Sequence, residues 1–387
     1  MEMRWVMLGV LFLARMTMGF QFQAVPALTP ELASLYGVSL SGIGLLIGLY
    51  LAPGVLVAIP GGAIAAWLGD RRVIGGAMAV MFLGGAVMMF APGWEAALAG
   101  RVLAGTGGVI VNVVMTKMLV DWFAGREIAT ALAIFVNSWP VGIAAALLVL
   151  PPAAALGGLA LADGITLALI GAALVLFLAV YRPAPGAPQG PAGIAVAAFP
   201  VVPLACAGLV WAFYNAALAM VFGFGVVALG ALGWTTAAAA ALISAFMGAL
   251  AVSLPFGGLL ADRTGRRDTV ICASLAGFAL LCPLALVVGQ AWVPVILLLA
   301  GAVFGLAAGP VMSLPAQVLP QSARAFGMGV FFAIYYAVML GAPALGGGVA
   351  DASGDRTVVF VLAAGLSVAA LAALGAFRVA APGAVQP

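Results

Sequence analysis

Long apolar runs, each of the length that crosses a lipid bilayer, follow one another along almost the whole chain. Of the 387 residues, 66% are hydrophobic and only 6% are charged, whereas a soluble domain carries about 25% charged residues. A helix needs about 20 mainly apolar residues to cross the hydrocarbon. Twelve such runs lie near residues 5–28, 41–67, 73–91, 96–119, 128–150, 161–181, 201–224, 237–261, 269–288, 293–318, 325–350 and 357–377. The sequence therefore predicts an all-α membrane protein with twelve transmembrane helices.

The composition argues against several other classes of protein. The net charge is only +3 and is scattered along the chain, which is unlike a nucleic-acid-binding surface. The chain has no histidine, and its three cysteines, Cys206, Cys272 and Cys282, lie inside apolar runs. These residues cannot build a Cys/His metal site or a histidine-based catalytic relay. We therefore expect no enzyme activity, no cofactor, no metal and no nucleic-acid partner.

The distribution of prolines and basic residues predicts two halves and an orientation. Closely spaced prolines exclude a continuous helix after residue 181, so we expect bundles at 1–181 and 201–387 joined by a cytoplasmic linker at 182–200. With the N-terminus inside, eleven of the fourteen Lys and Arg residues lie on the cytoplasmic side. Both termini are therefore expected in the cytoplasm, and the first span is retained. A single lysine among abundant Ala, Gly and Arg is typical of a GC-rich bacterium, which predicts a bacterial inner membrane.

An internal repeat supports the division into halves. Residues 60–72 follow the second apolar run and residues 255–267 follow the eighth, and Gly61, Gly62 and Gly69 match Gly257, Gly258 and Gly265 at one constant offset. Repeats of this kind are typical of membrane transporters. We therefore expect two pseudo-symmetric bundles of six helices.

The second copy of this repeat, residues 258–267, resembles the cytoplasmic loop signature of the major facilitator superfamily. The resemblance implies two bundles that rock about a central cavity and secondary transport by alternating access. The first copy departs from the signature, since Ala66 stands where Asp262 stands in the second. The resemblance implies a gating role for Gly258, Asp262, Arg263, Arg266 and Arg267, and for Asp70, Arg71 and Arg72 in the first half. The alternative is that these arginines only anchor the topology.

A narrower resemblance concerns the fifth span. Asp121-Trp122-Phe123 before it and Asn137-Ser138-Trp139-Pro140 within it are similar to the cyanate-permease-like and nitrate/nitrite-porter-like branch. Nitrate porters of this superfamily use an arginine in the second span and another in the eighth, whereas residues 41–66 and 237–261 contain none. The resemblance therefore does not extend to nitrate specificity.

Arg15 is the most informative polar residue, because it lies near the centre of the first span. An arginine there costs about 2.5–3.5 kcal/mol on insertion scales and is seldom present without a partner or a function. The predicted span centres contain no Asp or Glu, so we expect Arg15 to bind a carboxylate or another small oxyanion. Gly19, one turn away, is expected to leave room for it. A structural arginine held by backbone carbonyls or by Gln21 and Gln23 is the alternative.

Other polar residues within the spans complete the predicted substrate site. Arg101 begins a glycine-rich stripe in the fourth span, in which Asn112 shares its helical face. Tyrosine and asparagine offer hydrogen bonds in an apolar wall, as small-solute pockets do; their alternative roles are helix packing and the lipid interface. The further candidates are Tyr214, Asn215, Asn137, Tyr335 and Tyr336.

These observations favour a monomeric secondary transporter for a small anionic organic or inorganic solute. Because the span centres lack a titratable carboxylate or histidine, coupling to a co-transported proton or to an exchanged anion is left open. An exporter of neutral or cationic amphiphiles that uses the aromatic and methionine-rich walls is the alternative. A membrane enzyme or a transporter-derived sensor is a third hypothesis, but it lacks a nucleophile and base.

Overall fold

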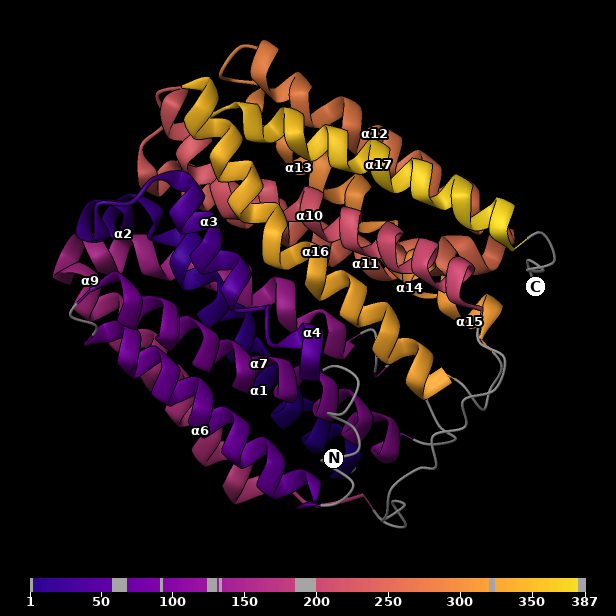
Figure 1. Ribbon diagram of the computed structural model, residues 1–387, viewed down its shortest axis with the longest axis horizontal. Helices are drawn as coiled ribbons and strands as arrows, with labels where there is room; N and C mark the ends of the chain where they lie inside the picture. The colour runs from indigo at the N-terminus through magenta and orange to yellow at the C-terminus, as the bar shows by residue number, and fades with distance from the viewer. Residues whose placement is uncertain are drawn as a thin grey trace. The chain divides into compact units, whose positions relative to one another are not determined.

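The structure is a computed structural model, which describes residues 3–57, 68–90, 93–123, 131, 134–184, 200–319 and 324–381. Within these ranges, helices are the only regular secondary structure, as Figure 1 shows. The prediction of an all-helical membrane fold is confirmed.

The chain divides into two compact units. Unit 1 comprises residues 1–36 and 49–193, and unit 2 comprises residues 37–48 and 194–387. The helices of unit 1 are α1 (Met3–Ala27), α2 (Thr29–Tyr36), α4 (Gly54–Val57), α6 (Asp70–Met89), α7 (Trp94–Trp122) and α9 (Ser138–Val180). Those of unit 2 are α3 (Leu40–Leu49), α10 (Val201–Ala231), α11 (Thr236–Thr264), α12 (Arg267–Val287), α13 (Val293–Gly305), α14 (Ala308–Met312), α15 (Leu314–Val318), α16 (Arg324–Ser353) and α17 (Val358–Ala380). The last residue of α3, Leu49, already belongs to unit 1.

The described residues contain eleven helical stretches that are long and apolar enough to cross a membrane. One of them includes α9, whose 43 residues contain non-helical backbone at Gly157 and Gly158. A continuous helix of that length would measure about 65 Å, roughly twice the 30 Å thickness of the hydrocarbon. The helix therefore accounts for two spans that meet at Gly158, where φ is +67°. With this division the described residues contain twelve spans.

The structure corrects the expected course of three spans. The first is followed by a separate helix, α2, which the apolar pattern did not predict. The second is interrupted by a turn at Leu51–Pro53 between α3 and α4, and its expected end at 58–67 lies outside the described residues. The tenth, expected at 293–318, is divided into α13, α14 and α15. Proline removes a backbone donor and disfavours a helical conformation before it, and Pro53, Pro310 and Pro315 lie at these interruptions.

Within each unit, one helix packs against several others. In unit 1, α1 packs against α9 and α7, and α6 packs against α7 and α9. In unit 2, α10 packs against α16, α17 and α11, and most of its residues are buried. Figure 1 shows α10 and α17 running side by side. A helix that is apolar all round and buried is the centre of its bundle.

Residues 40–48 of α3 pack in unit 2 against α16. A Cβ atom added at Gly44 or Gly48 would collide with the backbone at Pro343 or Leu340, so the two helices touch backbone to backbone. The carboxylate of Asp351 on α16 accepts hydrogen bonds from the backbone amides of Leu40, at 3.2 Å, and Ser41, at 2.8 Å. Asp351 therefore supplies acceptors for the first amides of α3, which have no partner within the helix.

The repeated loops share one conformational feature. Gly69 precedes α6 with φ +82°, and its counterpart Gly265 ends α11 with φ +65°. This left-handed region strongly favours glycine. The glycine correspondence in the sequence thus reflects the same backbone requirement in both halves.

Candidate functional site

Arg15 is the middle residue of α1, about 18 Å along the helix from either end. Its Nε donates to Asn112 Oδ1 on α7 at 3.0 Å, and its Nη1 donates to Ser138 Oγ on α9 at 2.9 Å. Nη1 also lies 3.0 and 3.1 Å from the carbonyl oxygens of Phe135 and Val136. The guanidinium carbon lies 4.9 Å from the centre of the Phe135 ring. These neutral groups orient the guanidinium.

The expected gap beside Arg15 is absent, and this prediction is wrong. A Cβ at Gly19 would lie 2.7 Å from the carbonyl oxygen of Trp139. Gly142 on α9 is similarly close to the backbone of Met16 and Phe20 on α1. Small residues on both helices therefore allow a close crossing of α1 and α9, and the space beside Gly19 is filled by α9.

Asn137 lies in the same short segment as the partners of Arg15. Its Oδ1 atom is buried and accepts no hydrogen bond from the residues that the structure describes. Its neighbour Ser138 is fully buried, and the Ser138 hydroxyl donates to the carbonyl of Phe135 at 2.6 Å. A buried acceptor without a donor costs about 1–3 kcal/mol, so Asn137 is placed to accept a hydrogen bond from a bound molecule or water.

Arg101 lies elsewhere in unit 1 and is 1% exposed. Its Nη1 and Nη2 donate to the backbone carbonyls of Gln21 and Phe22 on α1, at 3.0 and 2.6 Å. The guanidinium also lies over the Tyr50 ring, 4.5 Å from its centre. Arg101 therefore joins α7 to α1 and to the turn after α3. Asn112, expected on the same face of α7, contacts Arg15 instead of Arg101.

The candidate residues of unit 2 form an aromatic cluster on α10, α13 and α16. Trp211 stacks on Tyr214 with ring centres 5.4 Å apart, and Tyr214 stacks on Phe304 at 4.3 Å. Tyr335 lies 6.3 Å from Trp211 and 4.8 Å from Tyr336. Packing of this kind holds the rings in fixed orientations.

The polar atoms of this cluster differ in their partners. The Tyr214 hydroxyl donates to the carbonyl of Phe304 at 3.3 Å, and Asn215 Nδ2 donates to the carbonyl of Trp211 at 2.8 Å. The Trp211 Nε1 atom is buried and donates to none of the residues that the structure describes. Trp211 therefore has a donor available to an acceptor on a ligand.

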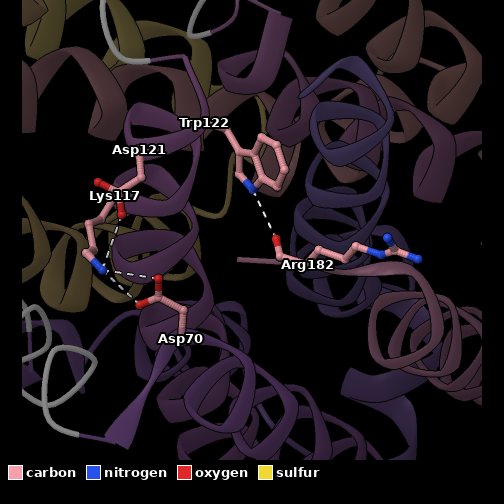
Figure 2. Close-up of polar contacts among 5 residues, drawn as sticks. All are labelled: Asp70, Lys117, Asp121, Trp122 and Arg182. Carbon is pink, nitrogen blue, oxygen red and sulfur yellow. Dashed lines mark hydrogen bonds and ion pairs between the residues drawn. The ribbon is translucent and has the colours of Figure 1, made fainter. Parts of the chain in front are cut away.

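A charged cluster joins the end of α7 to the start of α6 in unit 1. Figure 2 shows the ammonium of Lys117 between two carboxylates, with Nζ 3.1 Å from both oxygens of Asp70 and 3.3 Å from Asp121 Oδ2. Beside it, Trp122 Nε1 donates to the carbonyl of Arg182 at 3.1 Å. Burial, followed by the charges of Asp70 and Asp121, raises the pKa of Tyr181 above its ordinary value.

Comparison with known proteins identifies the family. A sequence profile described as the Major Facilitator Superfamily matches residues 9–233 and 204–387. The chain belongs to the major facilitator superfamily. It is therefore a multi-pass membrane transporter with the fold of that family. Among curated proteins, no sequence matches it.

Solved structures of this superfamily share its fold at low sequence identity. A bacterial homologue of the human lysosomal transporter Spinster, inward-facing and occupied, has a TM-score of 0.73 at 15% identity over 99% of this chain and 97% of its own. The nucleoside transporter NupG, as a D323A mutant, has a TM-score of 0.75 at 17% identity over 97% and 100%. The human organic anion transporter MFSD10 (TETRAN) has a TM-score of 0.73 at 16% identity over 96% and 99%.

The structure places the expected gating residues differently in the two halves of this superfamily member. In unit 1, Asp70 binds Lys117, Arg71 Nη2 donates to the carbonyl of Leu178 at 2.5 Å, and Arg72 is exposed. In unit 2, Gly258 lies on α11 with open space where a Cβ would point. The side chain of Asp262 lies outside the described residues. Arg263 and Arg266 are exposed, whereas Arg267 is half-buried at the start of α12.

Two ion-pair clusters were missed by the sequence analysis. Arg378, which the sequence analysis did not single out, binds Asp268 through Nε at 2.6 Å and Nη2 at 2.5 Å, and donates to Gln317 at 2.9 Å. No local pattern brings these three positions together. Lys117 and Asp121, by contrast, are four residues apart on one helix, a spacing that predicts a pair.

Proposed function

We propose that this transporter carries a small anionic solute by alternating access, with Arg15 as its main charge partner. The observation that carries the proposal is the position of the Arg15 guanidinium at the middle of α1, oriented by uncharged acceptors on α7 and α9. A guanidinium suits a carboxylate or another oxyanion, with which it forms charge-assisted hydrogen bonds. In a low-dielectric setting, attraction between such a pair is stronger than in water.

The other candidates have secondary roles in this proposal. Trp211 supplies a further donor for an acceptor on the solute, and Asn137 supplies an acceptor. Tyr214, Asn215, Tyr335 and Tyr336 shape the aromatic part of the wall. Arg101 contributes positive charge. The match to a human organic anion transporter agrees with a solute of this class.

The proposal includes the organisation of the protein. Residues 1–181 and 201–387 are its two six-helix bundles, 182–200 is the cytoplasmic linker, and both termini are cytoplasmic. The protein works as a monomer in a bacterial inner membrane. Asp262, Gly258 and the neighbouring arginines, with Asp70, Arg71 and Arg72, act in gating.

The test is a thermal-unfolding screen of the detergent-purified protein against small anions, zwitterions, neutral solutes and cations. A ligand at 100 times its Kd stabilises the folded state by about 2.7 kcal/mol, which raises the unfolding temperature measurably. We expect stabilisation by anions for the wild type and loss of this effect in Arg15→Ala. Uptake of the same anion into liposomes is then expected to be lost in the same variant.

Arg356→Ala is the matched control, because Arg356 is exposed in the segment between α16 and α17. This variant should keep the response to anions. If cationic or neutral amphiphiles stabilise the protein and Arg15→Ala responds as the wild type does, Arg15 is structural. The export of amphiphiles past the Trp211 and Tyr335 rings would then replace anion transport.

A further inference from the structure

Unit 1 contains a cavity that Arg15 and its hydrogen-bond partners do not line. The cavity has a volume of about 110 Å³ and lies among α1, α2, α6, α7 and α9. The apolar part of its wall is mostly leucine and methionine, and Gln21, Tyr36, Arg101, Asp163 and Thr166 supply polar groups. Since one water needs roughly 10–15 Å³ of such space, the cavity has room for a molecule of several non-hydrogen atoms.

Most polar groups in this wall already have partners. Gln21 donates to the carbonyl of Met81 at 2.9 Å and accepts from the Tyr50 hydroxyl at 3.2 Å. The Thr166 hydroxyl donates to the carbonyl of Ala162 at 3.0 Å. Arg101 donates to two backbone carbonyls of α1. These hydrogen bonds therefore hold the side chains of Gln21, Thr166 and Arg101 in place around the cavity.

Asp163 is different from its neighbours. It is the one carboxylate among the residues that line the cavity, and it makes no hydrogen bond or ion pair with any residue in the described ranges. Tyr36 lines the same cavity, and burial, followed by the negative charge of Asp163, raises the pKa of the Tyr36 hydroxyl above its ordinary value. A half-buried carboxylate beside apolar walls is costly unless a cation or a hydrogen-bond donor compensates it.

The chemistry of the wall indicates the kind of compensating group. A primary ammonium offers three donors to a carboxylate, and the bond is charge-assisted. The leucine and methionine walls suit a short aliphatic chain. Arg101 also lines the cavity, and a guanidinium suits a hydroxyl or an anionic oxygen at the other end of the ligand.

We propose that this cavity binds a small primary ammonium compound that carries an oxygen at its second end, with Asp163 as the ammonium partner. An amino alcohol such as ethanolamine has this chemistry, and so does the headgroup of phosphatidylethanolamine. Arg15, Asn112 and Ser138 do not line this cavity, whereas Arg101 does. The proposal therefore does not depend on anion binding at Arg15.

The test uses ethanolamine as the probe, with the full-length protein in detergent free of phosphatidylethanolamine. Isothermal titration should show saturable binding to the wild type, and Asp163→Asn should raise the Kd by at least about tenfold, since a hydrogen bond to a charged group contributes about 1.5–3 kcal/mol. Ala160→Leu, which fills the cavity without changing a charge, should weaken binding as well. Glu95→Gln is the matched control, because Glu95 is exposed at the first turn of α7, and it should bind as the wild type does.

Two further experiments distinguish free ethanolamine from the lipid headgroup as the occupant, and the Asp163 cavity from the proposed anion site at Arg15. In nanodiscs of phosphatidylcholine, added ethanolamine should bind, whereas discs containing phosphatidylethanolamine should prevent its binding if the lipid headgroup is the occupant. Arg15→Ala should keep ethanolamine binding, and Asp163→Asn should keep any response to anions. Equal ethanolamine binding by the wild type and Asp163→Asn, or no saturable binding of either ethanolamine or the lipid, would overturn the proposal.

Discussion

At the scale of single residues, the hydrogen-bond partner of Arg15 can be given a negative charge with little change in side-chain shape, because aspartate and asparagine are nearly the same size. Asn112→Asp places a carboxylate about 3.0 Å from the Arg15 guanidinium. We expect this internal anion to compete with an anionic solute and to raise its Kd by about tenfold or more. The unfolding temperature should not fall, because the new carboxylate is paired. Titration of the anion found in the thermal screen measures the first effect.

Asn112→Leu is the neutral comparison for this prediction. It removes the same hydrogen bond without adding a negative charge, so its affinity for the anion should fall less than that of Asn112→Asp. Anion binding by Asn112→Asp as tight as that of the wild type would be incompatible with Arg15 as the charge partner.

A second residue-scale prediction concerns Lys117, which lies between Asp70 and Asp121. Lys117→Met leaves two carboxylates facing each other without a cation. Because the side chain of Lys117 is 35% exposed, solvent screens the loss, and we expect a cost of only about 1 kcal/mol. Thermal unfolding in detergent measures it.

Combining Lys117→Met with Asp70→Asn should recover part of the lost stability, because one of the two like charges that repel each other is then removed. Arg72→Met is the control, since Arg72 is exposed and lies two residues from Asp70. If Lys117→Met unfolds at the temperature of the wild type, the cluster contributes nothing measurable to the packing of α6 on α7.

At the scale of secondary-structure elements, α3 depends on α16 for its first turn. Both carboxylate oxygens of Asp351 accept from amides at the start of α3. Asp351→Ala removes both acceptors and should cost about 1 kcal/mol, as the loss of a helix cap does. Hydrogen exchange of the peptide covering residues 37–48 should become faster.

Asp355→Asn is the control for the α3 prediction. Asp355 accepts from Thr357 within its own loop, and these hydrogen bonds lower the pKa of its carboxyl below the ordinary value. Its substitution should leave the exchange of residues 37–48 unchanged. Equal exchange of that peptide in Asp351→Ala and the wild type would show that the glycine contacts with α16 hold α3 alone.

At the scale of the whole molecule, the sequence predicted the helical membrane fold and its family, because span length and loop glycines are local properties. Gly69 and Gly265 could be matched, since both positions have a positive φ, which favours glycine. The gap at Gly19 was predicted wrongly, because a glycine signals close approach without indicating which backbone fills the space. The contacts of Arg378 with Asp268 and Gln317 join residues far apart in sequence, and no local spacing encodes them.

The break in α9 at Gly157 and Gly158 decides the number of spans. That number in turn determines on which side of the membrane every later segment lies. If Gly157 and Gly158 form an outer loop, Leu156, which is 87% exposed, should be accessible from outside the cell. Leu156→Cys, in a variant with Cys206, Cys272 and Cys282 replaced by alanine, is expected to react with a membrane-impermeant maleimide added to intact cells. Pro183→Cys, at an exposed position after the second part of α9, should react only after the membrane is opened. A single long span would place Leu156 within the hydrocarbon and leave its cysteine unlabelled in both conditions, which would reduce the spans to eleven and reverse the orientation of unit 2.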